Sequence, residues 1–310
     1  MNSGTIFLNE FGRIRSGWRA LFFLAACIFF MFGLNAIVFG ILIGAGVDLD
    51  EHVAATTALG SFLSLVPPIA FGWLFGSLFE GLPFRALGGW FTGGWLKHLA
   101  LGGAIGAFTI GIAALISMAL GGLRFTLDIS NTAESIGESL LVSLGVFIVA
   151  AAFEEALFRG YLLQTLNRAG FGPLAIAVTS VFFGSVHLMN PSANLFSTVN
   201  TMLAGVWFGV AYLKTRDLWF PFGIHLLWNW VQGSVLGIEV SGLTKLSPAP
   251  ILNEIDRGPA WLTGESYGIE ASVACTVAIL VSIVFIHFMP WVRPDPGMLA
   301  MTSKEAANRT

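Results

Sequence analysis

The stretch FEEALFR, residues 153–159, places two adjacent glutamates and an arginine inside the long apolar run Leu140–Arg168. A helix that crosses a bilayer needs about 20 mostly apolar residues, and this run is long enough. Charged side chains at membrane depth are costly, and they usually face a cavity or one another. The stretch therefore predicts a membrane helix that carries functional side chains.

The composition of the whole chain is that of a membrane protein. Of its 310 residues, 55% are hydrophobic and 11% are charged, whereas a soluble domain has about 25% charged residues. The net charge of −3 says little about partners, and no basic cluster suggests nucleic acid as one of them. Cys27 and Cys275 lie in apolar runs without metal-ligand spacing, so we expect small buried side chains rather than a disulfide or a metal site.

Apolar runs of this kind recur along the chain. They predict an all-α fold, a polytopic transmembrane bundle of about eight helices that forms one domain over residues 1–310. The eight runs are Ala20–Gly46, Ala54–Phe79, Leu99–Leu120, Leu140–Arg168, Gly172–Met189, Leu195–Leu213, Leu218–Gly237 and Ala271–Trp291.

The positions of Lys and Arg predict the orientation of the bundle. Cytoplasmic segments carry an excess of these residues. With the N-terminus inside, eleven of them lie at the inner side and three at the outer side, leaving aside Arg159 within its run. Both termini are therefore predicted to be cytoplasmic. The loop Glu239–Glu270 then lies outside, and its length is typical of functional or irregular loops.

Two histidines follow the glutamates in later apolar runs, His187 and His225. If the fourth and fifth runs form an antiparallel hairpin, Glu154 lies 15 residues before Ala169 and His187 lies 15 residues after Gly172, on either side of the turn. At a rise of about 1.5 Å per residue, both stand about 22 Å from the turn. Their side chains are therefore predicted to meet.

Helical spacing divides the polar residues into pairs. Glu155 and Arg159 are four residues apart and share a helix face, whereas Glu154 points about 100° away. We expect Glu155 to pair with Arg159, which leaves Glu154 to face a cavity as a base. His225 and Asn229 also share a face, and both can donate a hydrogen bond to a developing oxyanion.

A single membrane histidine can serve only to hydrogen-bond a neighbouring helix. The joint occurrence of Glu154, His187, His225 and Asn229 instead predicts one functional site, in the cytoplasmic half of the membrane. These residue types can activate water and stabilise an oxyanion. Three other classes stay open: a transporter or proton relay, a haem protein with two histidine ligands, and a non-catalytic membrane scaffold.

The order of the polar motifs resembles a known family. The motifs are Glu154-Glu155-x-x-x-Arg159, Phe183-x-x-x-His187 and His225-x-x-x-Asn229. They resemble those of the CPBP intramembrane proteases, which group CAAX prenyl endopeptidases with bacteriocin-processing and immunity proteins and are also called the Abi family. The resemblance covers a motif-bearing core, residues 140–237. It implies an integral, multi-pass endopeptidase, and the compact loops point to a bacterial plasma membrane.

The resemblance also implies roles for individual residues. Glu154 and His187 are expected to activate water, and His225 and Asn229 to form the oxyanion hole. The supporting residues are Glu155, Arg159 and Phe183. The substrate is expected to be a membrane-embedded or membrane-proximal peptide or protein, CAAX-like substrates included, within the lipid bilayer. A scaffold or bacteriocin-immunity protein with the same fold is the alternative.

The residues leave two interpretations of the cofactor. Glu154, His187 and His225 match a zinc ligand set in type, although the helical His-Glu-x-x-His pattern is absent. A glutamate-dependent mechanism without metal gives Asn229 a role, whereas Asn is a poor zinc ligand. We therefore favour a mechanism with no cofactor, with zinc held by the two histidines and the glutamate as the alternative.

Overall fold

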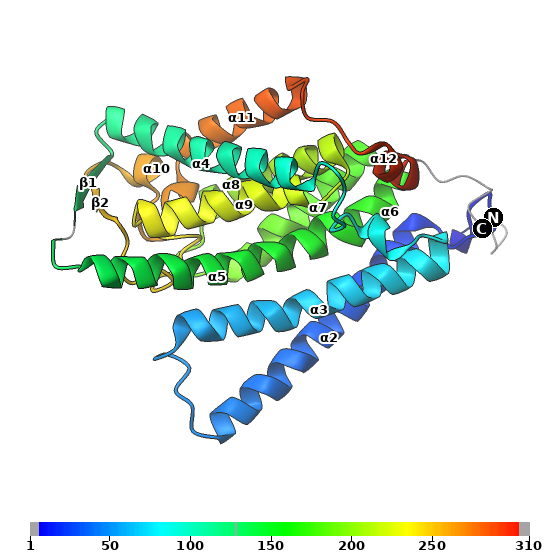
Figure 1. Ribbon diagram of the computed structural model, residues 1–310, viewed down its shortest axis with the longest axis horizontal. Coiled ribbons are helices and arrows are strands. Elements are labelled where there is room, and N and C mark those ends of the chain that lie inside the picture. Colours follow the sequence, from blue (N-terminus) through cyan, green and yellow to red (C-terminus); the bar gives the residue numbers. More distant parts are fainter. Residues whose placement is uncertain (1–5, 128, 304–310) are drawn as a thin grey trace.

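The chain forms a bundle of helices in the computed structural model, which describes residues 6–127 and 129–303 (Figure 1). The main helices are α2 (Ser16–Gly44), α3 (Val53–Glu80), α4 (Trp95–Ala119), α5 (Ala133–Leu157), α6 (Leu163–Arg168), α7 (Gly172–Val186), α8 (Leu195–Thr215), α9 (Trp219–Trp230) and α11 (Val273–Phe288). Shorter elements are α10 (Ala260–Thr263), α12 (Pro296–Thr302) and the strands β1 (Leu123–Leu127) and β2 (Leu252–Asp256). Short 3-10 helices are η1 (Phe84–Leu87), η3 (His187–Met189), η5 (Glu265–Tyr267) and η6 (Ile269–Ala271). Short π-helical turns are η2 (Phe158–Leu162) and η4 (Val231–Val235).

The predicted fold class is confirmed, because the bundle is helical and polytopic. Within the described residues, six helices are long and apolar enough to cross a membrane: α2, α3, α4, the continuous Ala133–Arg168, Gly172–Met189 and α8. The other two predicted runs also form helices, α9 and α11, but these have only 12 and 16 α-helical residues. The chain continues after α9 directly into the π-helical turn η4, and α9 packs against α4, α5 and α8.

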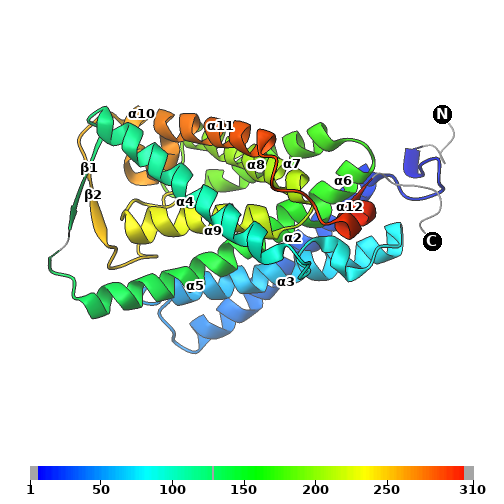
Figure 2. The ribbon, with the colours of Figure 1, turned by 45° about the horizontal axis from the view of Figure 1, so that its top comes forward.

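The start of α2 and the short α12 lie at one end of the bundle, and the β1–β2 ribbon lies at the other (Figures 1 and 2). The start of the first described helix and the last described helix thus lie at the same end, as the predicted topology requires. Which end faces the cytoplasm stays a prediction.

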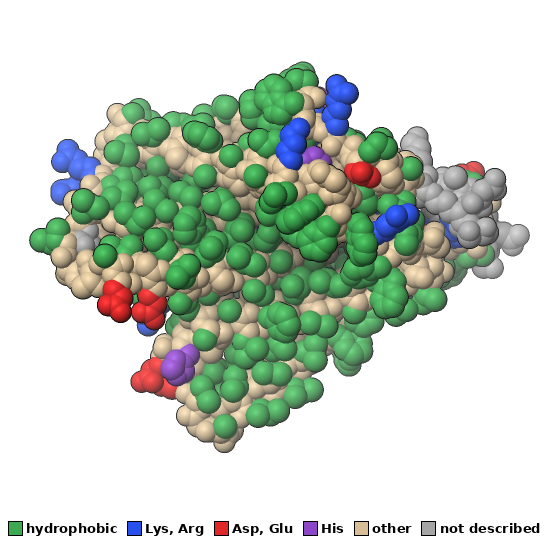
Figure 3. Space-filling model, viewed as in Figure 1, with side chains coloured by type: hydrophobic (Ala, Val, Ile, Leu, Met, Phe, Trp, Pro, Cys, Tyr) green, Lys and Arg blue, Asp and Glu red, His purple; other side chains and the backbone are tan. Residues whose placement is uncertain are grey.

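The surface of the bundle is apolar. Hydrophobic side chains cover most of the face shown in Figure 3. Phe29, Phe32 and Phe108 are among the most exposed, at 72%, 72% and 74% of their surface. A water-soluble monomer rarely exposes apolar patches of this extent, so these helices are suited to contact lipid. The protein is an integral, multi-pass membrane protein.

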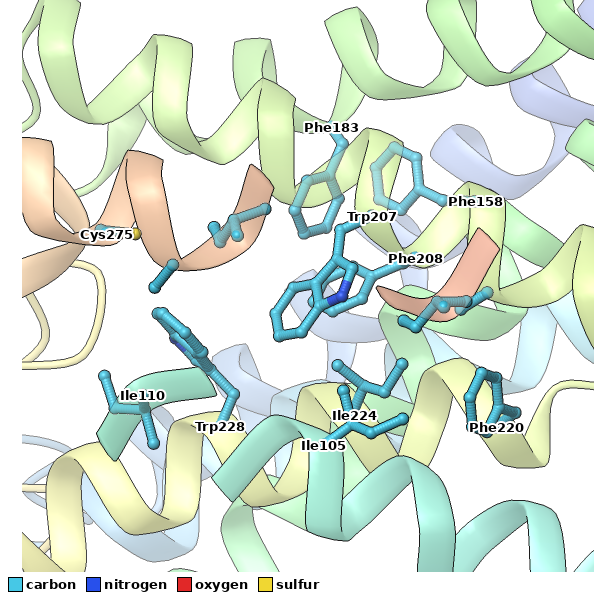
Figure 4. Packing of buried hydrophobic residues seen from close by; sticks show 14 of the residues in the cluster. Ile105, Ile110, Phe158, Phe183, Trp207, Phe208, Phe220, Ile224, Trp228 and Cys275 are labelled. Carbon is cyan, nitrogen blue, oxygen red and sulfur yellow. The ribbon is translucent and has the colours of Figure 1, made fainter. Parts of the chain in front are cut away.

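The core lies where α8 faces α9, α4 and α11. Trp207 and Phe208 of α8 occupy its centre, with Ile224 and Trp228 of α9 on one side (Figure 4). Aromatic side chains bury large apolar areas, and Trp207 is fully buried. The two cysteines of the chain are free and buried, as the sequence predicts.

Glycines allow α4 and α9 to approach closely. A Cβ added at Gly106 would lie 2.2 Å from the carbonyl oxygen of Ile224, and one at Gly223 would lie 2.4 Å from that of Leu99. Small residues at such contacts let helix backbones pack directly in membranes. Because α9 carries His225 and Asn229, this contact also sets the position of both residues.

We expect Gly106→Ala to lower the free energy of unfolding by about 1–3 kcal/mol, because the added methyl group overpacks the contact with α9. Gly111→Ala is the matched control on the same helix, since a Cβ there meets nothing within 4 Å. Relief of the glycine backbone entropy should leave the control unchanged or stabilised by up to about 1 kcal/mol. Thermal unfolding in detergent measures both variants, and equal shifts would contradict the proposed contact.

The structure adds an element that the sequence did not predict, an antiparallel ribbon of β1 and β2 in which Phe125 pairs with Glu254. Both carboxylate oxygens of Glu254 are buried without a hydrogen-bond partner. Burial, and the nearby carboxylates of Asp256 and Glu239, raise the pKa of Glu254 to about 9. The side chain is therefore neutral in the folded protein at pH 7.

This pKa makes the stability of the folded state depend on pH. In the unfolded chain a glutamate titrates near pH 4.3, so the folded state binds one more proton between that pH and about 9. The part of the free energy of unfolding that depends on Glu254 is therefore greatest below this pH window. It falls as the pH rises through the window, by at most about 1.4 kcal/mol per pH unit. We expect Glu254→Gln to reduce this loss in unfolding measurements from pH 5 to 9, whereas an unchanged slope would contradict the assignment.

Candidate active site

Four predicted residues come together in one cavity of about 240 Å³. Glu154 lies in the last turn of α5, His187 opens the turn η3 directly after α7, and α9 carries His225 and Asn229. Because α7 is short, His187 at its end reaches the depth of Glu154. The cavity has room for several water molecules.

The carboxylate of Glu154 lies between the two histidines. Its Oε2 atom is 4.0 Å from His187 Nε2 and 3.7 Å from His225 Nε2. The predicted meeting of Glu154 and His187 is thus observed. The sequence did not predict that His225 would be the nearer of the two. Both distances exceed a direct hydrogen bond, which leaves room for a bridging water near the three groups.

The Nδ1 atom of each histidine ring lies within hydrogen-bond distance of an acceptor. His187 Nδ1 is 2.7 Å from the carbonyl oxygen of Phe183, and His225 Nδ1 is 3.0 Å from Glu155 Oε1. A carbonyl can only accept, so His187 carries its proton on Nδ1, and an ionised Glu155 fixes the same choice for His225. In the neutral rings, both Nε2 atoms therefore present a lone pair toward Glu154.

Glu155 and Arg159 form the predicted pair, and both are 1% exposed. Arg159 Nη1 donates to Glu155 Oε1 over 3.2 Å, and Nη2 donates to the carbonyl oxygen of Gly205 on α8 over 3.2 Å. Glu155 Oε1 thus accepts from both Arg159 and His225. Through Glu155, the arginine is connected to the ring that faces the cavity.

Aromatic rings fix the planes of these side chains. Phe208 stacks on His225 with ring centroids 4.7 Å apart, and Phe183 lies 4.6 Å from His187. The Arg159 guanidinium lies over Phe183 and Phe208, at 4.6 and 4.8 Å from their centroids. Cation–π contacts of this kind strengthen when water is excluded. The predicted position of Phe183 beside the site is thus observed.

The carboxylate of Glu154 and the Nε2 atoms of the two histidines are of the types that bind zinc. Zinc sites in proteins bring nitrogen and oxygen ligands to about 2 Å from the ion. Among residues 6–127 and 129–303, no group of three or more His, Cys, Asp and Glu side chains has an arrangement that could hold a metal ion. Zinc held by Glu154, His187 and His225 stays the alternative to a mechanism without metal.

Sequence reasoning missed the opposite wall of the cavity, to which Asn190, Asn200, Ser241 and Glu270 contribute. Burial raises the pKa of Glu270, while hydrogen bonds from Ser241 and Gln232 act in the opposite direction. The one signal available was an acidic residue directly before the last apolar run. Its partners lie in a loop without periodicity, so no pattern connected them.

The fold and the site define a class, a polytopic helical membrane protein with a buried glutamate–histidine centre. A family model described as Type II CAAX prenyl endopeptidase Rce1-like matches residues 136–231. The match confirms the resemblance to CPBP proteases over this segment of the chain. It includes Glu154, His187, His225 and Asn229. No curated protein and no solved structure matches the chain.

We expect Arg159→Gln to lower the free energy of unfolding by about 3–5 kcal/mol, because it leaves the Glu155 carboxylate buried without its cation. The double variant Glu155→Gln/Arg159→Gln should lose less than the sum of the two single variants, by about 0.5–3 kcal/mol. Chemical unfolding in detergent measures the cycle, with Arg257→Gln on the exposed loop as the control. Additive losses would show that the pair is not coupled.

Proposed function

We propose that the protein is an intramembrane endopeptidase that hydrolyses a peptide bond with water activated by glutamate and histidine. The observation that carries the proposal is the position of Glu154 Oε2 between the Nε2 atoms of His187 and His225 in a cavity of about 240 Å³. The match to a protease family over the same residues supports it.

Water activation follows from the direction of the lone pairs. A water among the three groups can donate one hydrogen to Glu154 Oε2 and the other to His187 Nε2. Its own lone pair then points at the carbonyl carbon of a peptide in the cavity. Glu154 takes the proton as the oxygen–carbon bond forms, which is general base catalysis.

The attack leaves a negative oxygen on the tetrahedral carbon. Asn229 lies one helical turn beyond His225 on the cavity wall and can donate its amide hydrogen. His225 can donate from Nε2 when it carries a second proton, and the buried Glu155 carboxylate at 3.0 Å from Nδ1 offsets that charge. One such donor is worth about 3 kcal/mol of barrier.

Collapse of this intermediate breaks the carbon–nitrogen bond. Glu154 returns its proton to the leaving nitrogen, so the products are a carboxylic acid and an amine. The proton that Glu154 takes from the attacking water is the one that it returns, and the second proton of His225 stays on that ring. The proposed mechanism therefore requires no cofactor.

The proposed substrate is a membrane-embedded or membrane-proximal peptide or protein, CAAX-like substrates included, cleaved by an enzyme of the bacterial plasma membrane. Two features support a substrate that arrives through the bilayer. The surrounding helices expose large apolar side chains, and the cavity that contains Glu154 is lined mostly by apolar groups.

We expect Glu154→Gln to lower kcat/KM by about 10²–10⁴-fold, because glutamine cannot accept the proton of the attacking water. The assay is cleavage of a quenched membrane-peptide library by purified protein in liposomes. Glu138→Gln is the matched control, since it makes the same change on an exposed position of the same helix.

Wild-type activity that survives in Glu154→Gln would contradict the role of the base and favour the scaffold or immunity-protein alternative. The same assay with a chelator tests the cofactor. Activity that persists agrees with the proposed metal-free mechanism. Activity that is lost with chelator and restored by zinc would replace it with the zinc alternative, held by Glu154, His187 and His225.

A further inference from the structure

Glu270, on the turn η6 before α11, makes a dense set of hydrogen bonds at the far wall of the cavity. It accepts the backbone amide hydrogen of Ser241, and the Ser241 hydroxyl donates to its two oxygens over 3.1 Å each. Gln232 Nε2 donates to Oε2 over 3.2 Å. Both oxygens of this one carboxyl group thus accept hydrogen bonds from the same residue, Ser241.

This network joins the segments that carry the catalytic candidates. Gln232 is fully buried in η4, which continues α9 beyond Asn229. Asn190, directly after the turn that bears His187, donates to the Ser241 carbonyl over 3.1 Å. The Ser241 turn is thus bonded both to the segment after α7 and, through Glu270, to the segment after α9.

The backbone at Ser241 has a strained conformation, which contacts with the surrounding residues must stabilise. Its φ of +51° lies in the left-handed region, which non-glycine residues rarely adopt. Such conformations cost about 1–3 kcal/mol and persist only where the surroundings fix them. Glu270 binds both the amide and the hydroxyl of this residue, and Asn190 binds its carbonyl, so these two side chains hold the turn.

Glu270 is itself fixed from the other side. Asn200 of α8 donates to the carbonyl oxygens of Glu270 and Ser272 over 2.7 and 2.9 Å. Ser272 caps α11 by accepting the amide hydrogen of Cys275. The carboxylate therefore projects from a rigid base rather than from a free loop.

We propose that Glu270 is a positioning residue of the peptidase centre, which holds the Ser241 turn closed over the cavity and thereby fixes the His187 and His225 segments relative to each other. Its link to catalysis rests on the proposed function, whereas its link to the Ser241 turn does not. The two links are therefore tested by separate measurements.

The first measurement is hydrogen–deuterium exchange of the peptide that covers residues 239–242. In Glu270→Gln an NH2 group, which cannot accept a hydrogen bond, replaces one of the two oxygens that hold Ser241, so exchange of the Ser241 amide should accelerate by about tenfold. Glu270→Asp keeps both carboxyl oxygens and should restore part of the protection. Glu265→Gln, on an exposed position of the same loop, is the matched control and should exchange as the wild type does.

The second measurement is kinetics on the same variants. Misplacement of catalytic groups by about 1 Å can cost about 100-fold in rate. We expect Glu270→Gln to lower kcat by about 10- to 100-fold with little change in KM, and Glu270→Asp to recover part of the loss. Glu154→Gln in the same series shows independently whether the cleavage depends on the proposed base.

Each outcome decides the proposal. Faster exchange together with a lower kcat supports it. Unchanged exchange in Glu270→Gln overturns the role in the turn, and faster exchange with a normal kcat overturns the positioning role. If wild type and Glu154→Gln cleave equally, the proposed function fails, while the exchange result still decides whether Glu270 holds the turn.

Discussion

The buried ion pair between Arg159 and Glu155 is the interaction on which the site depends. Its arginine contacts α8 through the Gly205 carbonyl and α7 through the ring of Phe183. Its glutamate reaches α9 through His225. Buried charged groups are costly when they lose their hydrogen-bond partners, so a rearrangement that breaks these contacts with α7, α8 or α9 is unfavourable. The pair thereby restricts how the helices around the cavity can be arranged.

Both helices that carry the site change their winding next to it. After α5, the π-helical turn η2 contains Arg159 and a non-helical Gly160 with ψ of −134°. After α9, the π-helical turn η4 contains Gln232. Wide turns of this kind are rare and are found mostly at functional sites. Here they allow two buried polar side chains, Arg159 and Gln232, to reach partners on other elements.

The sequence was sufficient for the features that depend on local pattern. Apolar runs predicted the helices, and equal spacing from one turn predicted that Glu154 would meet His187. It could not predict the bond between Glu155 and His225, because that bond depends on how α9 is rotated in its glycine-lined contact with α4. The strands and the partners of Glu270 were also missed. They lie in loops, where long-range contacts rather than periodicity decide the conformation.

The adjacent residues Glu154 and Glu155 of α5 have different surroundings. This difference explains how they can have different roles. Glu154 is 23% exposed and lines the cavity that also contains His187 and His225. Glu155 is 1% exposed and borders a separate, apolar cavity of about 260 Å³ on another side of α5. A helix turns about 100° per residue, so adjacent side chains cannot share one environment. Glu155 is held by Arg159 and His225, which makes it a fixed acceptor. Glu154 Oε2 has no hydrogen-bond partner in the protein, which leaves that oxygen available to a reacting water.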